Sequence, residues 1–222
     1  EEDLVKYAFA LFLNHDFEKS LEVANMGLKK NPRHAAFNRL AMYNNTDLKR
    51  FEEALKAADV FFNECDKADY SYLDYMYYGH LLEELKKYDE AVGQYEKAVE
   101  LDPTKTDLYK NISSVYEQKN DYKKAIGAYH KYYSSLEKEK QTPDLQFQLG
   151  RLYYGAGTQP DSLTINVEER KQALMSADSV FQVISEAAPD SYLGNFWRAR
   201  ANSALDPETT QGLAKPFYEE VA

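Results

Sequence analysis

The sequence predicts an all-α fold in which helix–turn–helix units stack on one another. The first observation is a period: Tyr75 and Gly79 are followed 34 residues later by Tyr109 and Ser113, residues of similar kinds in the same order. A fixed period in this range is the signature of a repeat array, in which each unit buries its apolar faces against its neighbours. Apolar residues within each unit also recur at helical spacing. The nine glycines are few, and most of the seven prolines fall between these segments, which disfavours a fold rich in β-turns.

The array is expected to be a single domain spanning the whole chain. Its units are expected at residues 1–34, 35–68, 72–105, 106–139 and 143–190, followed by a partial unit at residues 191–222. In the first unit, Leu4 and Ala8 lie on one face of the first helix, residues 14–16 form the turn, and Pro32 ends the second helix. In the second unit, Ala54 repeats the place of Ser20.

The third and fourth units are the closest pair. Three extra residues, 69–71, precede the third unit, and a surface connection absorbs such an insertion at little cost. The third unit ends at Pro103. Glu137 stands at the equivalent place of the fourth unit, where the second helix is therefore expected to run on to Lys140.

The fifth unit carries a long connection, expected from Gly155 to Val167. Loops of this length are unusual in a compact array, and one hypothesis is that this loop contacts a partner. The alternative is a tolerated insertion. The last segment leaves an apolar helix face around Phe217 at its end. Because solenoids need a polar cap, the chain is expected to be a fragment of a longer protein.

Composition disfavours several classes of function. The net charge of −10 disfavours binding to nucleic acid or to anionic lipid, and no apolar run is long enough to cross a bilayer. The lone cysteine, Cys65, excludes an internal disulfide. The four histidines are far apart in sequence, and no phosphate loop or nucleophile elbow is present. We therefore expect no metal, no cofactor and no enzymatic activity.

The residues at the repeating places identify the family that the chain resembles. In the third unit these places hold Tyr75, Tyr78, Gly79, Leu82, Ala91, Tyr95, Ala98 and Pro103. This pattern resembles the tetratricopeptide repeat, and the resemblance covers nearly the whole chain. It implies a right-handed superhelix of about five to six repeats, acting as a scaffold that binds proteins.

A second resemblance concerns the C-terminal segment. The residues from Phe196 to Tyr218 are similar to a recurring segment of exported repeat proteins from Bacteroidetes. This resemblance favours the periplasm or the cell envelope, while the cytoplasm stays open. The sequence lacks Met at position 1, so it carries no information about a signal peptide.

The concave face of the superhelix is the expected binding surface for a protein or peptide. First-helix residues one or two places from the packing positions should line this groove: Arg39, Tyr43, Met76, His80, Lys110, Ser114, Phe147 and Arg151. Family members that grip a terminal carboxylate use a Lys/Asn/Arg set across three units, and the Asn partners are missing here. Aromatic and basic side chains in such a groove suit an extended or helical segment of a partner.

Two other hypotheses remain open. The chain is alternatively an accessory or regulatory module of a larger enzyme or of an envelope transport assembly. A third hypothesis is self-association through the C-terminal helix, whose apolar face carries Phe217 and Tyr218.

Overall fold

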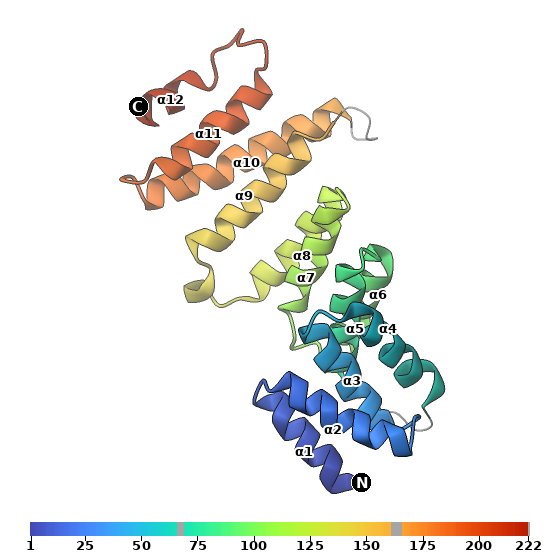
Figure 1. Ribbon diagram of the computed structural model, residues 1–222. Coiled ribbons are helices and arrows are strands. Elements are labelled where there is room, and N and C mark those ends of the chain that lie inside the picture. The colour runs from blue at the N-terminus through green and yellow to red at the C-terminus, as the bar shows by residue number, and fades with distance from the viewer. Residues whose placement is uncertain (66–68, 161–165, 222) are drawn as a thin grey trace. The chain divides into compact units, whose positions relative to one another are not determined.

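The computed structural model describes residues 1–65, 69–160 and 166–221, and all regular elements in this part of the chain are helices (Figure 1). The helices are α1 Glu2–Leu13, α2 Phe17–Lys30, α3 Ala35–Asp47, α4 Phe51–Asp59, α5 Tyr72–Glu84, α6 Tyr88–Leu101, α7 Leu108–Gln118, α8 Tyr122–Ser135, α9 Pro143–Gly157, α10 Val167–Ala187, α11 Tyr192–Leu205 and α12 Lys215–Val221. A π-helical turn, Val60–Glu64, continues α4. The predicted all-α fold of paired helices is confirmed.

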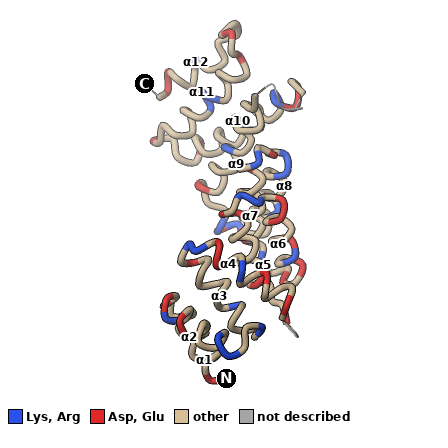
Figure 2. Tube along the Cα trace, turned by 45° about the vertical axis from the view of Figure 1, so that its right-hand side comes forward, with Lys and Arg blue, Asp and Glu red and all other residues tan. Residues whose placement is uncertain are grey.

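The chain divides into two compact units, which we describe separately: Glu1–Leu108 and Tyr109–Ala222. That all repeats form one continuous array stays a prediction. Figure 2 shows acidic and basic residues interspersed along the helices of each unit. None of the described helices is long and apolar enough to cross a bilayer.

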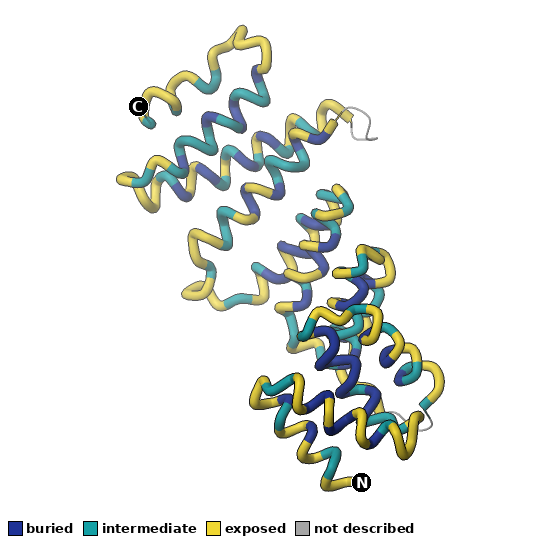
Figure 3. The backbone as a smooth tube through the Cα atoms, in the orientation of Figure 1, coloured by how far each residue is buried: buried dark blue, intermediate teal, exposed yellow. Residues whose placement is uncertain are grey.

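Helix α3 is the centre of the first unit. It packs against α1, α2, α4 and α5, so most of its residues are buried, and Figure 3 shows it almost continuously dark blue. Its ring contacts reach both neighbouring first helices: Tyr43 packs on Phe12 of α1 and stacks on Tyr77 of α5, with ring centroids 5.4 and 4.2 Å apart. A first helix enclosed in this way has little side-chain surface left for a ligand.

The repeat is also visible in the backbone of the turns between paired helices. His15, Lys49, Lys86 and Asn120 all have φ close to +60°, and each follows the end of a first helix. The amide of the next residue bonds back across the helix end, as Asp16 does to the Leu11 carbonyl and Lys87 to the Leu82 carbonyl. These left-handed residues close the helices without glycine.

Small residues on the first helices let aromatic rings of the second helices approach. A Cβ atom added to Gly79 would lie 2.8 Å from the ring of Tyr95, and one added to Gly150 would lie 2.6 Å from the ring of Phe181. Both rings are fully buried. The glycines are therefore required by the packing of α5 on α6 and of α9 on α10.

In the fourth repeat, α8 is shorter than the sequence predicts. It ends at Ser135, and Lys138–Lys140 form a separate 3₁₀ turn, so the expected continuation to Lys140 is wrong. The side chain of Gln141 donates to the carbonyls of Leu136 and Tyr133, and it thereby satisfies backbone acceptors at the helix end.

The connection in the fifth repeat is shorter than expected, because α9 extends to Gly157. Residues 161–165 of this loop lie outside the described residues, and contact of the loop with a partner stays a prediction. Its first part is anchored: buried Gln159 donates from Nε2 to the Asn120 carbonyl at 2.7 Å, and Arg170 donates to the Gln159 carbonyl at 3.1 Å.

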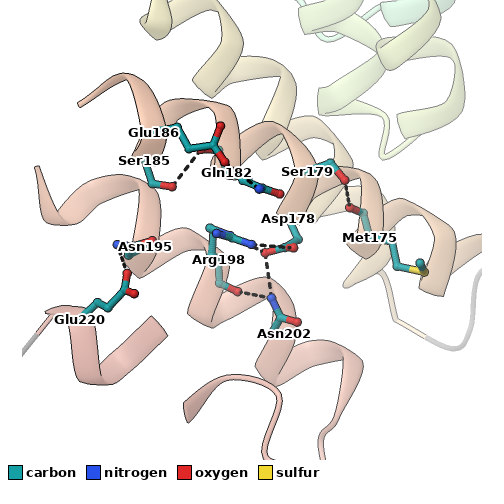
Figure 4. A network of polar contacts seen from close by, with 10 residues as sticks. All are labelled: Met175, Asp178, Ser179, Gln182, Ser185, Glu186, Asn195, Arg198, Asn202 and Glu220. Carbon is teal, nitrogen blue, oxygen red and sulfur yellow. Dashed lines mark hydrogen bonds and ion pairs between the residues drawn. The ribbon is translucent and has the colours of Figure 1, made fainter. Parts of the chain in front are cut away.

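A polar network joins the last three helices (Figure 4). The Arg198 guanidinium of α11 pairs with Asp178 of α10 at 3.0 Å, and Asn202 donates to the same carboxylate at 2.9 Å. The Arg198 guanidinium also lies over the ring of Phe217 in α12, 4.3 Å from its centroid. The network fixes α11 between its two neighbours.

Candidate functional site

The first two predicted groove residues, Arg39 and Tyr43, are bound to one buried carboxylate. Arg39 donates from Nε to Oδ1 of Asp74 at 2.7 Å and from Nη2 to Oδ2 at 3.1 Å. The Tyr43 hydroxyl donates to Oδ1 at 2.6 Å. Ser71 donates to Oδ2 through its amide and its hydroxyl, which also caps the start of α5. Asp74 is fully buried, so these donors replace its water shell.

This arrangement changes the expected role of the two residues. Tyr43 is 1% exposed, and burial together with the Asp74 charge raises the pKa of its hydroxyl. It belongs to the interior of the first unit rather than to an accessible groove. Arg39 also donates to the Asp69 carbonyl and is held between α3 and α5. The physical reason is the enclosure of α3, which sequence spacing does not reveal.

Met76 and His80 lie on α5 beside a polar cluster of the same unit. His80 is exposed and Met76 is half-buried. The Tyr77 hydroxyl donates to Oδ2 of Asp47 at 2.9 Å. Burial raises the pKa of the Asp47 carboxyl, and the Tyr77 bond and nearby His80 act in the opposite direction. This surface is polar and accessible at His80.

Lys110 and Ser114 lie on α7 in the second unit, and both are exposed. The Lys110 ammonium lies 5.9 Å from the centroid of the Tyr132 ring of α8. Ser113, the neighbour of Ser114, donates instead to the Ala125 carbonyl at 2.8 Å and joins α7 to α8. The two adjacent serines therefore differ: one holds the helix pair together and the other faces solvent.

Phe147 and Arg151 lie on α9 in the second unit. Phe147 is half-buried against Phe181 and Trp197, with ring centroids 5.7 and 5.5 Å apart. Arg151 is exposed, and Nη1 donates to the Gln148 side chain at 3.3 Å. Phe147 thus contributes part of its ring to the packing of α9 on α10 and α11.

The predicted groove residues do not include Arg200 of α11, which lies beside Trp197, a ring that packs on Phe147. Its guanidinium carbon lies 4.6 Å from the centroid of Trp197 and 5.2 Å from that of Tyr154 on α9. A signal for it was present: Arg151 directly follows the small residue Gly150, and Arg200 likewise follows Ala199, which is fully buried. Selecting the residue that directly follows the small packing residue of each first helix would therefore also have selected Arg200 in the last repeat.

A separate hollow of about 270 Å³ lies in the second unit among α8, α9 and α10. It includes second-helix side chains, which sequence reasoning did not propose as a site. Its lining residues are Tyr122, Lys123, Ile126, Tyr153, Ala156, Glu169, Gln172, Ala173 and Ser176. Burial raises the pKa values of both tyrosine hydroxyls, so each stays protonated near neutral pH. The hollow is mainly apolar and has charged groups from Lys123 and Glu169.

The C-terminal helix bears on the self-association hypothesis. Phe217, its central apolar residue, is half-buried under Arg198, whereas Tyr218 is 45% exposed. Self-association through α12 stays a prediction, and Tyr218 is a better residue than Phe217 for testing it.

Within the described ranges, no group of three or more His, Cys, Asp and Glu side chains is arranged to hold a metal ion.

Comparison with known proteins identifies the repeat. Residues 72–105 match the family model of the tetratricopeptide repeat. The chain is similar in structure to the C-terminal part of a TPR repeat-containing protein from Cytophaga hutchinsonii, a member of the Bacteroidetes. The two share 29% sequence identity and a TM-score of 0.71, over 98% of this chain and 77% of that chain.

Two further solved structures share the fold. MamA is 18% identical with a TM-score of 0.57, over 81% of this chain and 96% of that chain. The protein pilF of Pseudomonas aeruginosa is 12% identical with a TM-score of 0.58, over 99% of this chain and 89% of that chain. No curated protein sequence matches the chain. The chain therefore contains a tetratricopeptide repeat at residues 72–105 and shares the paired-helix fold of a TPR repeat-containing protein.

Proposed function

We propose that the protein is an interaction scaffold that binds a protein or peptide segment on the first helices of its repeats, with the main contacts in the second unit. The observation that carries this proposal is the set of accessible side chains on α7 and α9. Lys110, Ser114 and Arg151 are exposed, and Phe147 offers a half-buried ring. Side chains of this kind on a rigid helical surface suit recognition of a peptide backbone and its side chains.

The first unit contributes less under this proposal. His80 and Met76 are its accessible candidates, because Arg39 and Tyr43 are engaged with Asp74. Aromatic packing and the polar contacts of Asp74 hold α3 and α5 together. We therefore assign the first unit mainly a supporting role, and the second unit the role of recognition.

The test compares partners captured by the wild-type chain and by the double variant Lys110→Glu/Arg151→Glu. Charge reversal on the proposed face should reduce specific partners at least fivefold, as quantified by mass spectrometry of the bound fraction. The matched control is Lys123→Glu/Lys171→Glu, which introduces the same charge change at exposed positions of α8 and α10. Circular dichroism should show equal helix content in all three proteins.

The outcomes separate the proposed surface from its alternatives. Equal recovery of the same partners by wild type and the Lys110/Arg151 variant would contradict binding on α7 and α9. Loss only in the Lys123/Lys171 control would instead point to the hollow among α8, α9 and α10. Recovery of the chain within a stable complex with an enzyme or transport assembly would favour the accessory-module alternative.

A further inference from the structure

Arg200 in the second unit lies beside three aromatic rings. Its guanidinium carbon lies 4.6 Å from the Trp197 centroid, 5.2 Å from the Tyr154 centroid and 5.9 Å from the Phe196 centroid. A guanidinium at these distances is attracted by the negative face of each ring. Tyr154 belongs to α9 and the other two rings to α11, so Arg200 contacts rings on the first helices of two consecutive repeats.

The rings around Arg200 are themselves fixed by packing. Trp197 stacks on the fully buried Phe181, with centroids 5.4 Å apart, and meets Phe147 and Tyr154 edge to face at 5.5 and 5.4 Å. A side chain resting on such a surface loses less conformational freedom when it binds a ligand than a free side chain would. Arg200 is therefore held in advance of binding.

The charge of Arg200 lacks an acidic partner among the described residues, although the chain has a net charge of −10. Arg39 and Arg198 show the contrast, since each pairs with a carboxylate, of Asp74 and Asp178 respectively. Arg151 is three residues before Tyr154 on α9; its side chain donates to the neutral amide of Gln148, and its charge also acts on the Tyr122 hydroxyl of α8.

Stacking leaves the binding edges of a guanidinium available. Its attraction to aromatic rings uses the flat face, whereas its N–H groups point outward in the plane and fit a carboxylate through two parallel hydrogen bonds. Arg200 is half-buried and Arg151 is exposed, so both have accessible surface.

We propose that Arg200 and Arg151, together with the rings of Tyr154, Trp197 and Phe196, form a recognition site for a partner segment that carries acidic side chains beside an apolar residue. This inference rests on the proposed function and specifies the partner chemistry. The carboxylates pair with the two arginines, and the apolar side chain contacts the exposed parts of the rings. A protein segment is favoured over a nucleic acid because the net negative charge of the chain opposes a polyphosphate backbone.

The experiment selects peptides from a random dodecapeptide library displayed on phage against the immobilised wild-type protein. Selected peptides should be enriched in Asp and Glu next to aromatic or aliphatic residues. The same peptides are then synthesised with amidated C-termini, which removes the terminal carboxylate as a ligand, and their affinities are measured by fluorescence anisotropy at low and physiological salt.

Three variants test the assigned residues. Arg200→Gln should weaken binding at least tenfold and Arg151→Gln about threefold, while Arg200→Lys should recover only part of the loss, because lysine lacks the planar edge. Arg50→Gln neutralises an exposed arginine of the first unit and should leave the affinity unchanged. Thermal unfolding verifies that each variant is folded.

Other results would overturn this inference. It fails if the selection yields no binders, if the selected peptides show no acidic preference, or if Arg200→Gln binds them as wild type does. Binding of a single-stranded RNA or of phosphatidylglycerol vesicles, lost in Arg200→Gln while acidic peptides do not bind, would assign the site to another class of ligand. The broader proposal is judged separately, since neutral peptides sensitive to Lys110→Glu/Arg151→Glu would support the scaffold function without an acidic site.

Discussion

Arg39 and Asp74 form a two-bond ion pair between α3 and α5, with the Nε–Oδ1 distance at 2.7 Å and the Nη2–Oδ2 distance at 3.1 Å. The carboxylate is fully buried, and the arginine side chain is 29% exposed. A buried charge is tolerated only when its partners replace water, and here Tyr43 and Ser71 complete the set. The pair thus joins consecutive repeats of the first unit.

Removing the charge of Asp74 should strongly destabilise the first unit. We expect Asp74→Asn to lower the free energy of unfolding by about 3 kcal/mol, because Arg39 loses its counter-charge inside the fold. Urea denaturation followed by circular dichroism measures the change. Asp47→Asn is the matched control. Asp47 accepts one hydrogen bond from Tyr77, and the amide oxygen of Asn can accept the same bond, so the free energy of unfolding should fall by less than about 1 kcal/mol. Similar losses in both variants would contradict the special role of Asp74.

The same substitution should have opposite effects at two glycines of the first unit. Gly79→Ala places a Cβ atom 2.8 Å from the Tyr95 ring and should cost about 1–3 kcal/mol through overpacking. Gly93→Ala in α6 meets no atom within 4 Å and should gain about 0.5–1 kcal/mol, because alanine restricts the unfolded chain. Denaturant midpoints of the two variants test this. The packing argument is wrong if Gly79→Ala is neutral or stabilising.

Glycine should be favourable at the left-handed turn positions. Lys49 has φ of +58°, so Lys49→Gly should raise the free energy of unfolding by about 0.5–1 kcal/mol by relieving the steric cost of its Cβ. Lys56→Gly, at an exposed position inside α4, is the control and should cost about 1 kcal/mol. The thermal midpoint of each variant measures the sign. A fall in both midpoints would show that the turn is not strained at Lys49.

Asp206 should make part of the stability of the C-terminal segment depend on pH. Burial alone would raise the pKa of its carboxyl, but the amides of Gln211 and Gly212 and the Thr210 hydroxyl donate to it, and the net pKa is lowered below 3.8. A lowered folded-state pKa gives stability that is present above the unfolded value and lost as the pH falls through the folded value.

The measurement for Asp206 is thermal unfolding of wild type and Asp206→Asn between pH 2 and pH 7. Wild type should be more stable at pH 7, and the difference should begin to shrink near pH 4, where the unfolded chain binds the proton, and should vanish as the pH falls through the lower folded-state pKa. A difference that is constant over the whole range would mean that the charge of Asp206 contributes nothing.

The 34-residue period predicts the fold because it reflects packing within one helix pair, between residues that are close in sequence. Gly79 and Tyr95 are 16 positions apart in one helix pair, and their contact is encoded by residue size at fixed spacing. Helix pairs of this kind could therefore be predicted from residue types alone. The end of α8 could not, because Gln141 satisfies the carbonyl of Leu136 from beyond the helix end, and no repeat position signals that contact.

The candidate site was only partly predictable. Lys110 and Arg151 are accessible as their spacing suggests, and Arg200 follows the same rule one repeat later. The spacing predicts an accessible side chain for Tyr43 as well, and Tyr43 is nevertheless buried, because α1, α2, α4 and α5 surround α3.

The sequence by itself determined that this protein is built of paired helices, since helical spacing, small residues and aromatic residues act within a single repeat. The tertiary structure decided which charges are free. Arg39 and Arg198 are neutralised by Asp74 and Asp178, each on another helix, whereas Arg200 rests on aromatic rings. The physical reason is that burial and charge pairing depend on neighbours brought together from different helices, and spacing along one helix does not contain that information.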